Sequence, residues 1–462
     1  MINFGTQLAA RAAAGQPIRV GLIGAGKFTA MYLAQALTTP GIHILGVADL
    51  DRKRAEESFR RAGWPAERFA PDFATALESG ATVLTEDAHA LIAAPGLDIV
   101  VEATGQPRAA AEHCLAAIAA RRHVIMVSVE ADVVAGPLLA ARARENGVLY
   151  SLAYGDQPAI ICEHVEWARS AGFTVVAAGK GTRYLPHFHH STPDTVWENF
   201  GISAELARRV GNNPKMFNSF IDGSKSAIEM TAVCNATGLT PQPGGLGFPP
   251  ASIYELASVC KPKSAGGTLS HEGTTEVVSS LRRDGKPVPH HLQIGTYVIV
   301  KANNEFVRDC IREYGFYPDE SGYYAALFRP VHMIGFELGI SVASLVFHNE
   351  PTGAPRAFLS DVAAIAKRDL AAGEILDGEG GYTVWGKQIP AAASLAAGAL
   401  PLGLAHGVRL LRPKKAGEML SYADVALDPA DPLLRLRREM ESRFAPPPAV
   451  PAAHSSAAAM PA

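Results

Sequence analysis

The sequence predicts an α/β protein with a parallel-sheet domain, a central α+β domain and a small C-terminal β domain. Three observations support this prediction. Strand and helix patterns alternate over the first ~150 residues, which is typical of a parallel sheet with right-handed crossovers. Aromatic residues, Asn, Ser and Gly become more frequent after Gly155, where alternating strands appear. Short strands joined by Gly-rich turns occupy residues 358–427.

A glycine turn follows the first apolar strand, residues 18–23. Gly24 and Gly26 allow a tight turn whose backbone can approach a pyrophosphate, and the helix that starts at Lys27-Phe28 directs free N–H groups at that anion. The third position of the G-x-G-x-x-G pattern is Thr29, so we expect slightly wider packing between helix and strand. A glycine fingerprint alone is weak evidence, and the context decides.

The second apolar strand, residues 42–48, supplies that context because it ends in Asp49. This is the spacing expected of the carboxylate that meets the adenosine ribose, and it indicates a Rossmann-type dinucleotide domain. Asp49 favours NAD, because a carboxylate accepts hydrogen bonds from a free 2′-hydroxyl and repels a 2′-phosphate. Arg52, Lys53 and Arg54 follow within one helical turn and could clamp that phosphate.

The remaining elements of the first domain alternate in the same way. A charged helix is expected over residues 51–62, a strand over 97–105, an Ala-rich helix over 109–120 and a strand over 123–129. The turn at Thr104-Gly105 would lie beside the nicotinamide ribose. Glu130 follows the next strand and would also face the cofactor. A helix through Arg144 and a strand over 148–153 complete the pattern.

Bulk composition excludes several classes of function. Lys and Arg number 42 against 45 Asp and Glu, a net charge of −3, which argues against nucleic-acid or polybasic membrane binding. The five cysteines are scattered without any C-x-x-C pair, as in reduced cytosolic proteins. Residues 1–17 hold no apolar run and predict a short amphipathic helix rather than a secretory signal. We therefore expect a cytoplasmic protein.

The second half of the chain predicts a mixed domain. A strand over 173–179 leads into Lys180, a helix opens near Asn218 to Glu229, and a strand covers 295–301. Residues 330–347 predict a long apolar helix that packs against the first domain, and 349–355 a linker. The expected boundaries are 1–155 for the dinucleotide domain, 156–357 for the catalytic domain, 358–427 for the β domain and 428–462 for a largely disordered tail.

Several segments together resemble a known family. They are Val-Gly-Leu-Ile-Gly-Ala-Gly-Lys-Phe, Val-Val-Glu-Ala-Thr-Gly, Val-Glu-Ala-Asp, Ser-Leu-Ala-Tyr-Gly-Asp-Gln-Pro, Ala-Ala-Gly-Lys-Gly-Thr and Asp-Gly-Ser-Lys-Ser-Ala-Ile-Glu. Over residues 1–427 the chain resembles the deoxyxylulose-phosphate-reductoisomerase-like proteins, with a homoserine dehydrogenase-like first domain and a C-terminal SAF-type β domain. The resemblance implies NADPH-dependent conversion of 1-deoxy-D-xylulose 5-phosphate to 2-C-methyl-D-erythritol 4-phosphate, a step of isoprenoid biosynthesis.

Two lysines are candidates for the cation that a carbonyl reduction needs. Lys180 and Lys225 lie in Gly- and Ser-rich settings near expected strand and helix ends. An ammonium there would stabilise the alkoxide that forms as hydride arrives, or would hold a substrate phosphate. The alternative is two solvated lysines.

Carboxylates near these lysines could move protons or bind Mg²⁺. Asp156 and Asp222 are the favoured pair for contact with substrate. Each has a structural alternative. For Asp222 the alternative is to cap a helix, a role that Ser224 could also have. The other carboxylates are Glu130, Asp132 and Glu229, and Glu229 could pair with Lys225 at i,i+4. Asn218 and Ser219 could donate to a phosphate or could form a turn.

Histidine and basic clusters complete the candidates. His187, His189 and His190 could suggest a metal, but three imidazoles in one short loop rarely satisfy tetrahedral zinc. Solvated loop histidines are the better interpretation, also for His290 and His291. The basic residues Lys261, Lys263, Arg282 and Arg283 favour a solvated charged loop over a phosphate clamp.

The sequence therefore predicts a cytosolic NAD(P)-dependent oxidoreductase that uses NADP, with NAD as the alternative and Mg²⁺ as an additional candidate cofactor. The substrate would be a small molecule, such as a sugar phosphate, bound between the first two domains. A homo-oligomer is expected. Two other functions stay open: a dehydrogenase of a homoserine-like or sugar-acid substrate, and a non-catalytic sensor that binds NAD(P)H and engages partners through the β domain.

Overall fold

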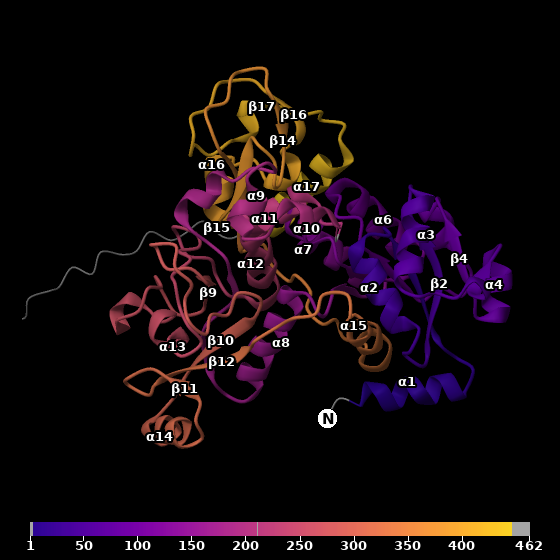
Figure 1. The fold of residues 1–462 in the computed structure, drawn as a ribbon, viewed down its shortest axis with the longest axis horizontal. Helices are drawn as coiled ribbons and strands as arrows, with labels where there is room; N and C mark the ends of the chain where they lie inside the picture. The colour runs from indigo at the N-terminus through magenta and orange to yellow at the C-terminus, as the bar shows by residue number, and fades with distance from the viewer. Residues whose placement is uncertain (1–2, 210, 446–462) are drawn as a thin grey trace, which may run out of the picture.

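Two sheet domains and a smaller β unit make up the fold, and the computed structural model describes residues 3–209 and 211–445 (Figure 1). In that view the first domain lies to the right, the second to the lower left, and the C-terminal unit above them. This α/β architecture confirms the predicted fold class.

A seven-stranded parallel sheet forms the centre of the first domain, in the order β3-β4-β2-β1-β5-β6-β7. The chain leaves β1 toward β2 on one side and returns to β5 on the other, so the crevice at the carboxyl ends of β1 and β5 is where such sheets bind ligands. The strands are β1 Ile18–Ile23, β2 Ile42–Ala48, β3 Phe69–Ala70, β4 Thr82–Thr85, β5 Ile99–Glu102, β6 His123–Met126 and β7 Tyr150–Leu152.

Helices cover both faces of this sheet, which is why its strands are apolar throughout. Val20 and Leu22 of β1 pack into one core cluster, and the following Ile23 packs into another. This alternation follows the pleat of a strand. The helices are α1 Phe4–Ala13, α2 Lys27–Ala36, α3 Arg52–Arg61, α4 Phe73–Ser79, α5 Ala88–Ala93, α6 Pro107–Ala119 and α7 Val129–Glu145.

The second domain has a mixed five-stranded sheet in the order β11-β12-β10-β8-β9. Its strands are β8 Thr174–Thr182, β9 Thr274–Ser279, β10 Thr296–Lys301, β11 Tyr317–Pro318 and β12 Tyr324–Arg329. Helices α8 and α12 pack on one face and α13 on the other. The helices are α8 Gln157–Ser170, α9 Val196–Phe200, α10 Ala204–Arg209, α11 Pro214–Ile221, α12 Ser224–Thr237, α13 Leu256–Val259 and α14 Glu305–Glu313.

The C-terminal unit consists of two small antiparallel sheets, β13-β15 and β14-β16-β17, as the Gly-rich turns predicted. Its elements are β13 Ser360–Ala366, β14 Ile375–Asp377, β15 Val384–Pro390, α16 Ala391–Ala397, β16 His406–Leu410 and β17 Val425–Ala426. Strands β13 and β15 pack against α12, so the unit shares part of its core with the second domain.

The segment after the C-terminal unit corrects the prediction of a largely disordered tail. Residues 432–444 form helix α17, Pro432–Phe444, which packs against α7. Fully buried Arg437 pairs with Asp361 of β13 at 2.5 Å and donates to the Val134 carbonyl of α7 at 3.3 Å. The predicted disorder of residues 446–462 lies outside the described part of the chain.

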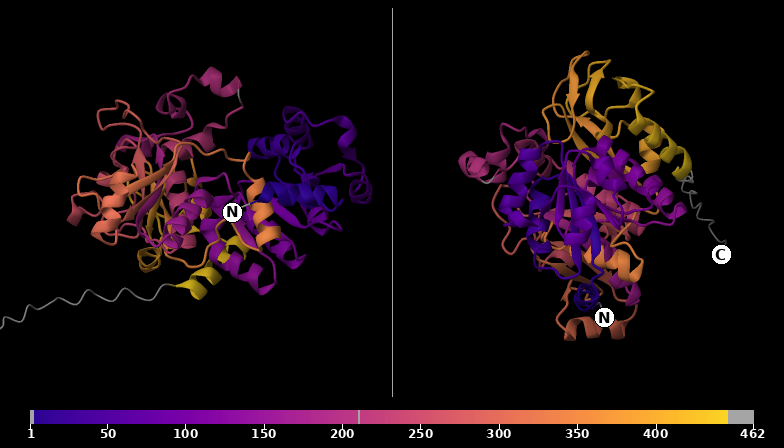
Figure 2. Two further views of the ribbon diagram at one scale, coloured as in Figure 1. Left: turned by 90° about the horizontal axis from the view of Figure 1, so that it is seen from below. Right: turned by 90° about the vertical axis from the view of Figure 1, so that its right-hand side faces the viewer.

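The expected long helix over residues 330–347 is also wrong in its first half. Helical structure begins only with α15, Gly339–Ala343, and continues as the π-helical turn η4, Ser344–His348. As predicted, this segment packs against the first domain, where Leu338 and Val342 share a core with Phe4 of α1. The left view of Figure 2 shows the same segment, in orange, beside the indigo domain.

Within residues 3–209 and 211–445, none of the helices combines the length and the apolar composition that a bilayer crossing needs.

Candidate active site

The glycine turn after β1 is tightly packed at one glycine and open at the other. Gly24 has a φ of +95°, and a Cβ there would lie 2.6 Å from the Ala103 carbonyl oxygen at the end of β5. At Gly26 a Cβ would meet nothing within 4 Å, so its backbone is open to a ligand. Buried Thr29 donates its hydroxyl to the Gly24 carbonyl at 2.5 Å and closes the turn. This geometry fits a pyrophosphate at the start of α2.

The first residues of α2 also meet the second domain. Lys27 Nζ donates to Asn212 Oδ1 at 3.4 Å. Phe28 packs beside the first-domain core, and its carbonyl oxygen lies 2.9 Å from where a Cβ of Gly335 would be. Two loops of the second domain therefore border the predicted phosphate site.

Asp49 is engaged in the protein rather than left free for a ribose. Its Oδ2 accepts from the Ala25 N–H at 2.6 Å, and Arg54 Nη2 contacts both carboxylate oxygens at 2.7 and 2.8 Å. Arg54 is more than half exposed, so it presents its charge at the edge where a 2′-phosphate would arrive. Arg52 instead pairs with Glu56 at 3.0 Å on the surface. The predicted contact of Asp49 with the ribose stays a prediction.

The turn after β5 is held rigidly at the carboxyl edge of the sheet. Buried Glu102 accepts from the Thr104 hydroxyl and from the Ser128 hydroxyl, each at 2.5 Å. Ser128 Oγ in turn accepts from the Gly105 N–H at 2.8 Å. Because Ser128 precedes α7, this network fixes the predicted nicotinamide-side turn next to the helix that carries Glu130.

Lys225 crosses from the second domain to that helix. Its ammonium lies 2.5 Å from Glu130 Oε1, and the two side chains retain 15 % and 14 % exposure, so small molecules can reach them. Burial lowers the pKa of Lys225, but a group of carboxylates led by Glu130 and Glu379 outweighs burial and raises that pKa above its ordinary value. Lys225 is therefore a permanent cation that joins the two domains.

Lys180 lies deeper, inside β8. It forms an ion pair with Glu229 of α12 and donates to Gln157 Oε1 at 2.9 Å, with only 4 % of its side chain exposed. Glu229 therefore pairs with Lys180 rather than with Lys225. Asp156 caps α8 by accepting the Gln157 N–H at 2.8 Å. Burial raises the pKa of Asp156 to about 6, and the neighbouring Glu229 carboxylate adds to the rise.

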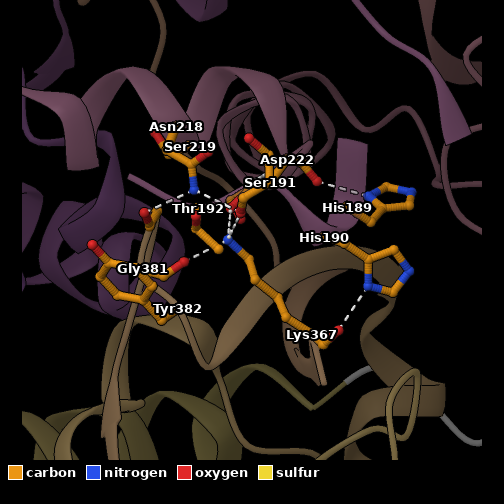
Figure 3. Close-up of polar contacts among 12 residues, drawn as sticks. His189, His190, Ser191, Thr192, Asn218, Ser219, Asp222, Lys367, Gly381 and Tyr382 are labelled. Atoms are coloured by element: carbon orange, nitrogen blue, oxygen red, sulfur yellow. Dashed lines mark hydrogen bonds and ion pairs between the residues drawn. The ribbon is translucent and has the colours of Figure 1, made fainter. Parts of the chain in front are cut away.

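Asp222 is fully buried and pairs with Lys367 of the C-terminal unit at 2.7 Å. Its Oδ1 also accepts the Ser224 N–H at 2.8 Å, which supports the start of α12 as the capping alternative predicted. Lys367 Nζ further donates to the carbonyls of Ser191 and Gly381, both at 2.7 Å (Figure 3). The predicted contact of Asp222 with substrate stays a prediction, and the observed geometry gives it an anchoring role.

Asn218 and Ser219 of α11 contribute to the same junction. The Asn218 amide donates to the Ser191 carbonyl at 2.9 Å (Figure 3) and to the Gly380 carbonyl at 2.9 Å. Ser219 Oγ donates to the Met216 carbonyl at 2.8 Å. These contacts correspond to the turn role that the sequence left open for them.

The histidine loop holds the C-terminal unit in place. His189 stacks on Trp385 with ring centroids 3.7 Å apart, and His190 Nδ1 contacts the Lys367 carbonyl at 2.7 Å. The prediction of solvated loop histidines is therefore wrong for half-buried His189, whereas His190 is exposed, as predicted. The basic loop residue Lys261 pairs with Asp319 at 2.6 Å, and Arg283 donates to the Phe248 carbonyl at 3.0 Å.

The carboxylates considered for Mg²⁺ do not fit a metal site. Glu130, Glu229 and Asp222 are each paired with a lysine. In the described part of the chain, no group of three or more His, Cys, Asp or Glu side chains has the arrangement that a metal ion needs. The prediction that Mg²⁺ contributes is therefore not supported.

Sequence reasoning missed two charged residues near the predicted site residues: Lys367, which pairs with Asp222, and Glu379, which raises the pKa of Lys225. Both come from the C-terminal unit, which the sequence did not connect with the cleft. The Gly-rich stretch 378–381 around Glu379 was the available signal, because such a stretch permits a close backbone approach.

Comparison with protein families assigns both large domains. Residues 20–152 match the NAD binding domain of homoserine dehydrogenase, and residues 155–338 match the catalytic domain of the oxidoreductase DRL. None of the curated proteins compared with the chain matches it.

Solved structures show weaker likeness. Biliverdin reductase from Synechocystis sp. PCC 6803 is 17% identical over 37% of this chain and 48% of its own, with a TM-score of 0.26. A probable dehydrogenase from Thermotoga maritima is 13% identical over 72% of this chain and 90% of its own, with a TM-score of 0.35. An NAD binding oxidoreductase from Klebsiella pneumoniae is 19% identical over 38% of this chain and 47% of its own, with a TM-score of 0.28. The chain thus spans about half the length of the first and the third.

The two family matches identify an NAD(P)-dependent oxidoreductase, with the dinucleotide domain preceding the catalytic domain. They confirm the predicted class of enzyme and the homoserine dehydrogenase-type first domain.

Proposed function

We propose that the protein uses NADPH to reduce a carbonyl group of a small polyhydroxylated substrate bound between the first and second domains. The observation that carries this proposal is the Lys225–Glu130 ion pair. It joins the start of α12 to the first turn of α7, and Ser128, the residue before α7, accepts from the Gly105 N–H of the turn expected beside the nicotinamide. A partly exposed cation at that position suits a carbonyl oxygen that becomes an alkoxide.

The cofactor, when bound, supplies hydride, and the chain supplies the surroundings. Gly24, Gly26 and the start of α2 would hold the pyrophosphate, and Arg54 would hold a 2′-phosphate. Lys225 would bind the substrate carbonyl oxygen and stabilise its developing negative charge. The carboxylates beside Lys225 would accept hydrogen bonds from substrate hydroxyls and fix the orientation of the carbonyl carbon.

Within this class, we propose the conversion of 1-deoxy-D-xylulose 5-phosphate to 2-C-methyl-D-erythritol 4-phosphate as the reaction. The sequence segments that resemble the reductoisomerase-like proteins support it, as does the partly exposed Lys225. The rearrangement that precedes reduction needs adjacent oxygens held by positive charge, and Lys225 would provide that charge.

The test is a turnover screen of the purified protein. Oxidation of NADPH and NADH is followed with 1-deoxy-D-xylulose 5-phosphate, other sugar phosphates and keto acids, and reduction of NADP⁺ and NAD⁺ with homoserine and sugar acids. We expect turnover with 1-deoxy-D-xylulose 5-phosphate and NADPH. Turnover with homoserine or a sugar acid, without turnover of 1-deoxy-D-xylulose 5-phosphate, would show that the protein acts on the former instead. Cofactor binding without any turnover would contradict the enzymatic proposal and favour the sensor.

A further inference from the structure

A connecting segment, residues 330–338, leads from β12 of the second domain to α15 beside the first domain (Figure 1). It starts in the same row of the second-domain sheet as Lys180. Thr296 of β10 pairs with Lys180 of β8 on one side and with Arg329, the last residue of β12, on the other. The connecting segment therefore leaves the sheet two strands away from Lys180.

The backbone of the connecting segment passes close to the starts of α8 and α2. A Cβ on Gly155, the residue before Asp156, would lie 3.0 Å from the Met333 carbonyl oxygen. A Cβ on Gly335 would lie 2.9 Å from the carbonyl oxygen of Phe28 in α2. The connecting segment thus borders the cleft between the two domains and touches the helix expected to hold the pyrophosphate.

The two ends of the connecting segment are joined by an ion pair between Arg329 and Glu337. Glu337 Oε2 also accepts the Met333 N–H at 3.1 Å, so its carboxylate is used within the segment. Among residues 330–338, His332 is the only other side chain that titrates. His332 is therefore the group of this segment that is left to exchange a proton.

One ring nitrogen of His332 is fixed by the protein. Nδ1 lies 2.7 Å from the Ile294 carbonyl oxygen. A carbonyl oxygen only accepts, so Nδ1 carries a hydrogen and this bond sets the orientation of the ring. Nε2 has no hydrogen-bond partner among the residues that the structure describes, and the side chain is only half-buried. A catalytic histidine is arranged in this way, with one nitrogen oriented by the protein and the other available to the substrate.

The contact with Ile294 places His332 at the Lys180 end of the sheet. The carbonyl of Gly295, the residue after Ile294, accepts the Gly181 N–H at 3.0 Å. Gly181 directly follows Lys180 in β8. The bond from His332 to Ile294 therefore holds the ring at the edge of the second domain where Lys180 lies.

This edge faces the part of α12 that carries Lys225. Glu229 forms an ion pair with Lys180 and follows Lys225 by one turn of α12. Lys225 in turn contacts Glu130 of the first domain. His332 and Lys225 thus come from neighbouring elements at the same interdomain cleft.

Three large apolar side chains of the connecting segment surround this position. Val331 and Met333, on either side of His332, and Phe336 are 41 % to 49 % exposed. Apolar side chains exposed together commonly mark a ligand-binding groove. With a substrate in the cleft, they would exclude water from the histidine ring.

We propose that His332 is the catalytic acid that protonates the substrate oxygen during carbonyl reduction. This inference rests on the proposed function. As hydride from NADPH forms a bond to the carbonyl carbon, the carbon–oxygen π bond breaks and its electron pair moves to the oxygen held by Lys225. The Nε2–H bond of the His332 imidazolium breaks, and its proton completes the alcohol. The products are the alcohol, NADP⁺ and the neutral imidazole, which regains a proton from water.

Two variants of the full chain test this role. His332→Asn keeps an N–H donor for the Ile294 carbonyl but has no counterpart of Nε2, whereas His332→Ala removes the whole ring. Both should lower kcat by at least ~10²-fold, the usual range for loss of a general acid. NADPH dissociation constants should stay within about twofold of the native value, because the predicted cofactor contacts lie in the first domain.

Added imidazole distinguishes proton transfer from a structural role. In His332→Ala the space left by the ring can admit free imidazole, which supplies the missing proton, so kcat should rise by about tenfold or more. A side chain that only supports the connecting segment would give no such rescue. Circular dichroism checks that both variants fold, and the kcat of His332→Asn decides the question if His332→Ala does not.

His271→Asn is the matched control. His271 Nε2 contacts Thr240 Oγ1 at 2.7 Å in the loop before β9. Because β9 runs parallel to β8, this loop lies away from the end of the sheet that carries Lys180. The kcat of this variant should equal that of the native enzyme.

Two results would overturn the proposal while the proposed function stands. One is a native kcat in His332→Asn. The other is a lower kcat in folded His332→Ala that imidazole does not raise. If the native enzyme reduces no carbonyl substrate at all, the proposed function fails first and this inference fails with it.

Discussion

Lys367 Nζ lies 2.7 Å from Asp222 Oδ2 in an ion pair that is almost completely buried, with 2 % and 0 % side-chain exposure. Asp222 ends α11 and Lys367 follows β13, so the pair joins the second domain to the C-terminal unit. Asp222 also lies three residues before Lys225. The attachment of the C-terminal unit and the placement of the candidate catalytic lysine therefore depend on the same junction.

Removing one partner of this pair should be strongly destabilising. Lys367→Met leaves the Asp222 carboxylate buried without its cation, which typically costs about 3–5 kcal/mol. We expect a clearly lower urea midpoint for unfolding followed by circular dichroism. Adding Asp222→Asn to Lys367→Met should restore part of the loss, because no uncompensated charge remains. Lys415→Met serves as control, since its pair with Asp369 is exposed, and should leave the midpoint unchanged. Equal midpoints for Lys367→Met and Lys415→Met would contradict the anchoring role.

Cofactor preference should depend on Arg54. The native protein is expected to bind NADPH at least tenfold more tightly than NADH, because Arg54 stands on the exposed side of Asp49 where a 2′-phosphate would lie. Arg54→Ala should raise the NADPH dissociation constant about tenfold or more and change that for NADH by less than about twofold.

Arg52→Ala is the matched control, because Arg52 pairs with Glu56 on the next helical turn. It should leave both constants unchanged in a fluorescence titration. A tenfold preference of the native protein for NADH would contradict the NADP assignment. It would instead support the predicted contact of Asp49 with the ribose.

Local pattern predicted the alternation of strands and helices in the first domain, although β3, α4, β4 and α5 were not among the predicted elements. Strand β2 begins at Ile42 and ends at Ala48 as expected, because both its faces are apolar and Asp49 stops the run. The helix expected over residues 330–347 failed for the opposite reason. Its apolar residues pack against α2 and the rest of the first domain. Gly335 has a φ of +81°, which interrupts a helix at that position. Apolar composition shows that a segment is buried, whereas its backbone conformation depends on the neighbours it meets.

The candidate site was also predicted only in part: the sequence indicated single residues but not the contacts between them. Lys225 and Glu130 were both predicted, but their pairing joins α12 to α7 across two domains, and no spacing along the chain indicates it. Glu379, which raises the pKa of Lys225, lay outside the prediction because it belongs to a turn of the C-terminal unit that no spacing along the chain connects with Lys225. Pairwise electrostatics of this kind exist only after folding.

Stability should fall as the pH rises toward neutrality because of Asp132. Burial raises the pKa of Asp132 to about 7, and the Tyr150 hydroxyl, which donates to Oδ1 at 2.7 Å, only partly offsets burial. The folded state thus holds a proton that the unfolded chain releases near pH 4. This contribution is complete below about pH 4 and is lost progressively up to about pH 7.

Asp132→Asn removes the titrating group, so the variant should gain stability over the native protein as the pH increases from about 5 to 8. Thermal unfolding at several pH values measures this difference. Asp284→Asn, which changes an exposed loop, is the control. Its unfolding temperature should differ from that of the native protein by the same amount at every pH. A constant difference between Asp132→Asn and the native protein would contradict the titration of Asp132.

The strongest prediction on activity concerns Lys225. Lys225→Met keeps the length and apolar part of the side chain but removes the cation beside Glu130 and Glu379. Because an ammonium stabilises the alkoxide only as hydride arrives, its loss should lower kcat/KM by at least ~10²-fold, the scale of a lost oxyanion donor. NADPH affinity should stay within about twofold, since the predicted cofactor contacts lie in the first domain. Steady-state kinetics and cofactor titration measure the two quantities.

Lys286→Met provides the control, because Lys286 is 76 % exposed and lies in a surface loop of the same domain. It should retain full kcat/KM. A loss in Lys225→Met that is confined to KM would show that Lys225 anchors the ground state, for instance through a substrate phosphate, and does not stabilise the transition state. Unchanged kinetics would show that the ion pair with Glu130 serves only to join the domains. Lys180 cannot simply take over the role of an accessible cation, because only 4 % of its side chain is exposed and Glu229 already neutralises it.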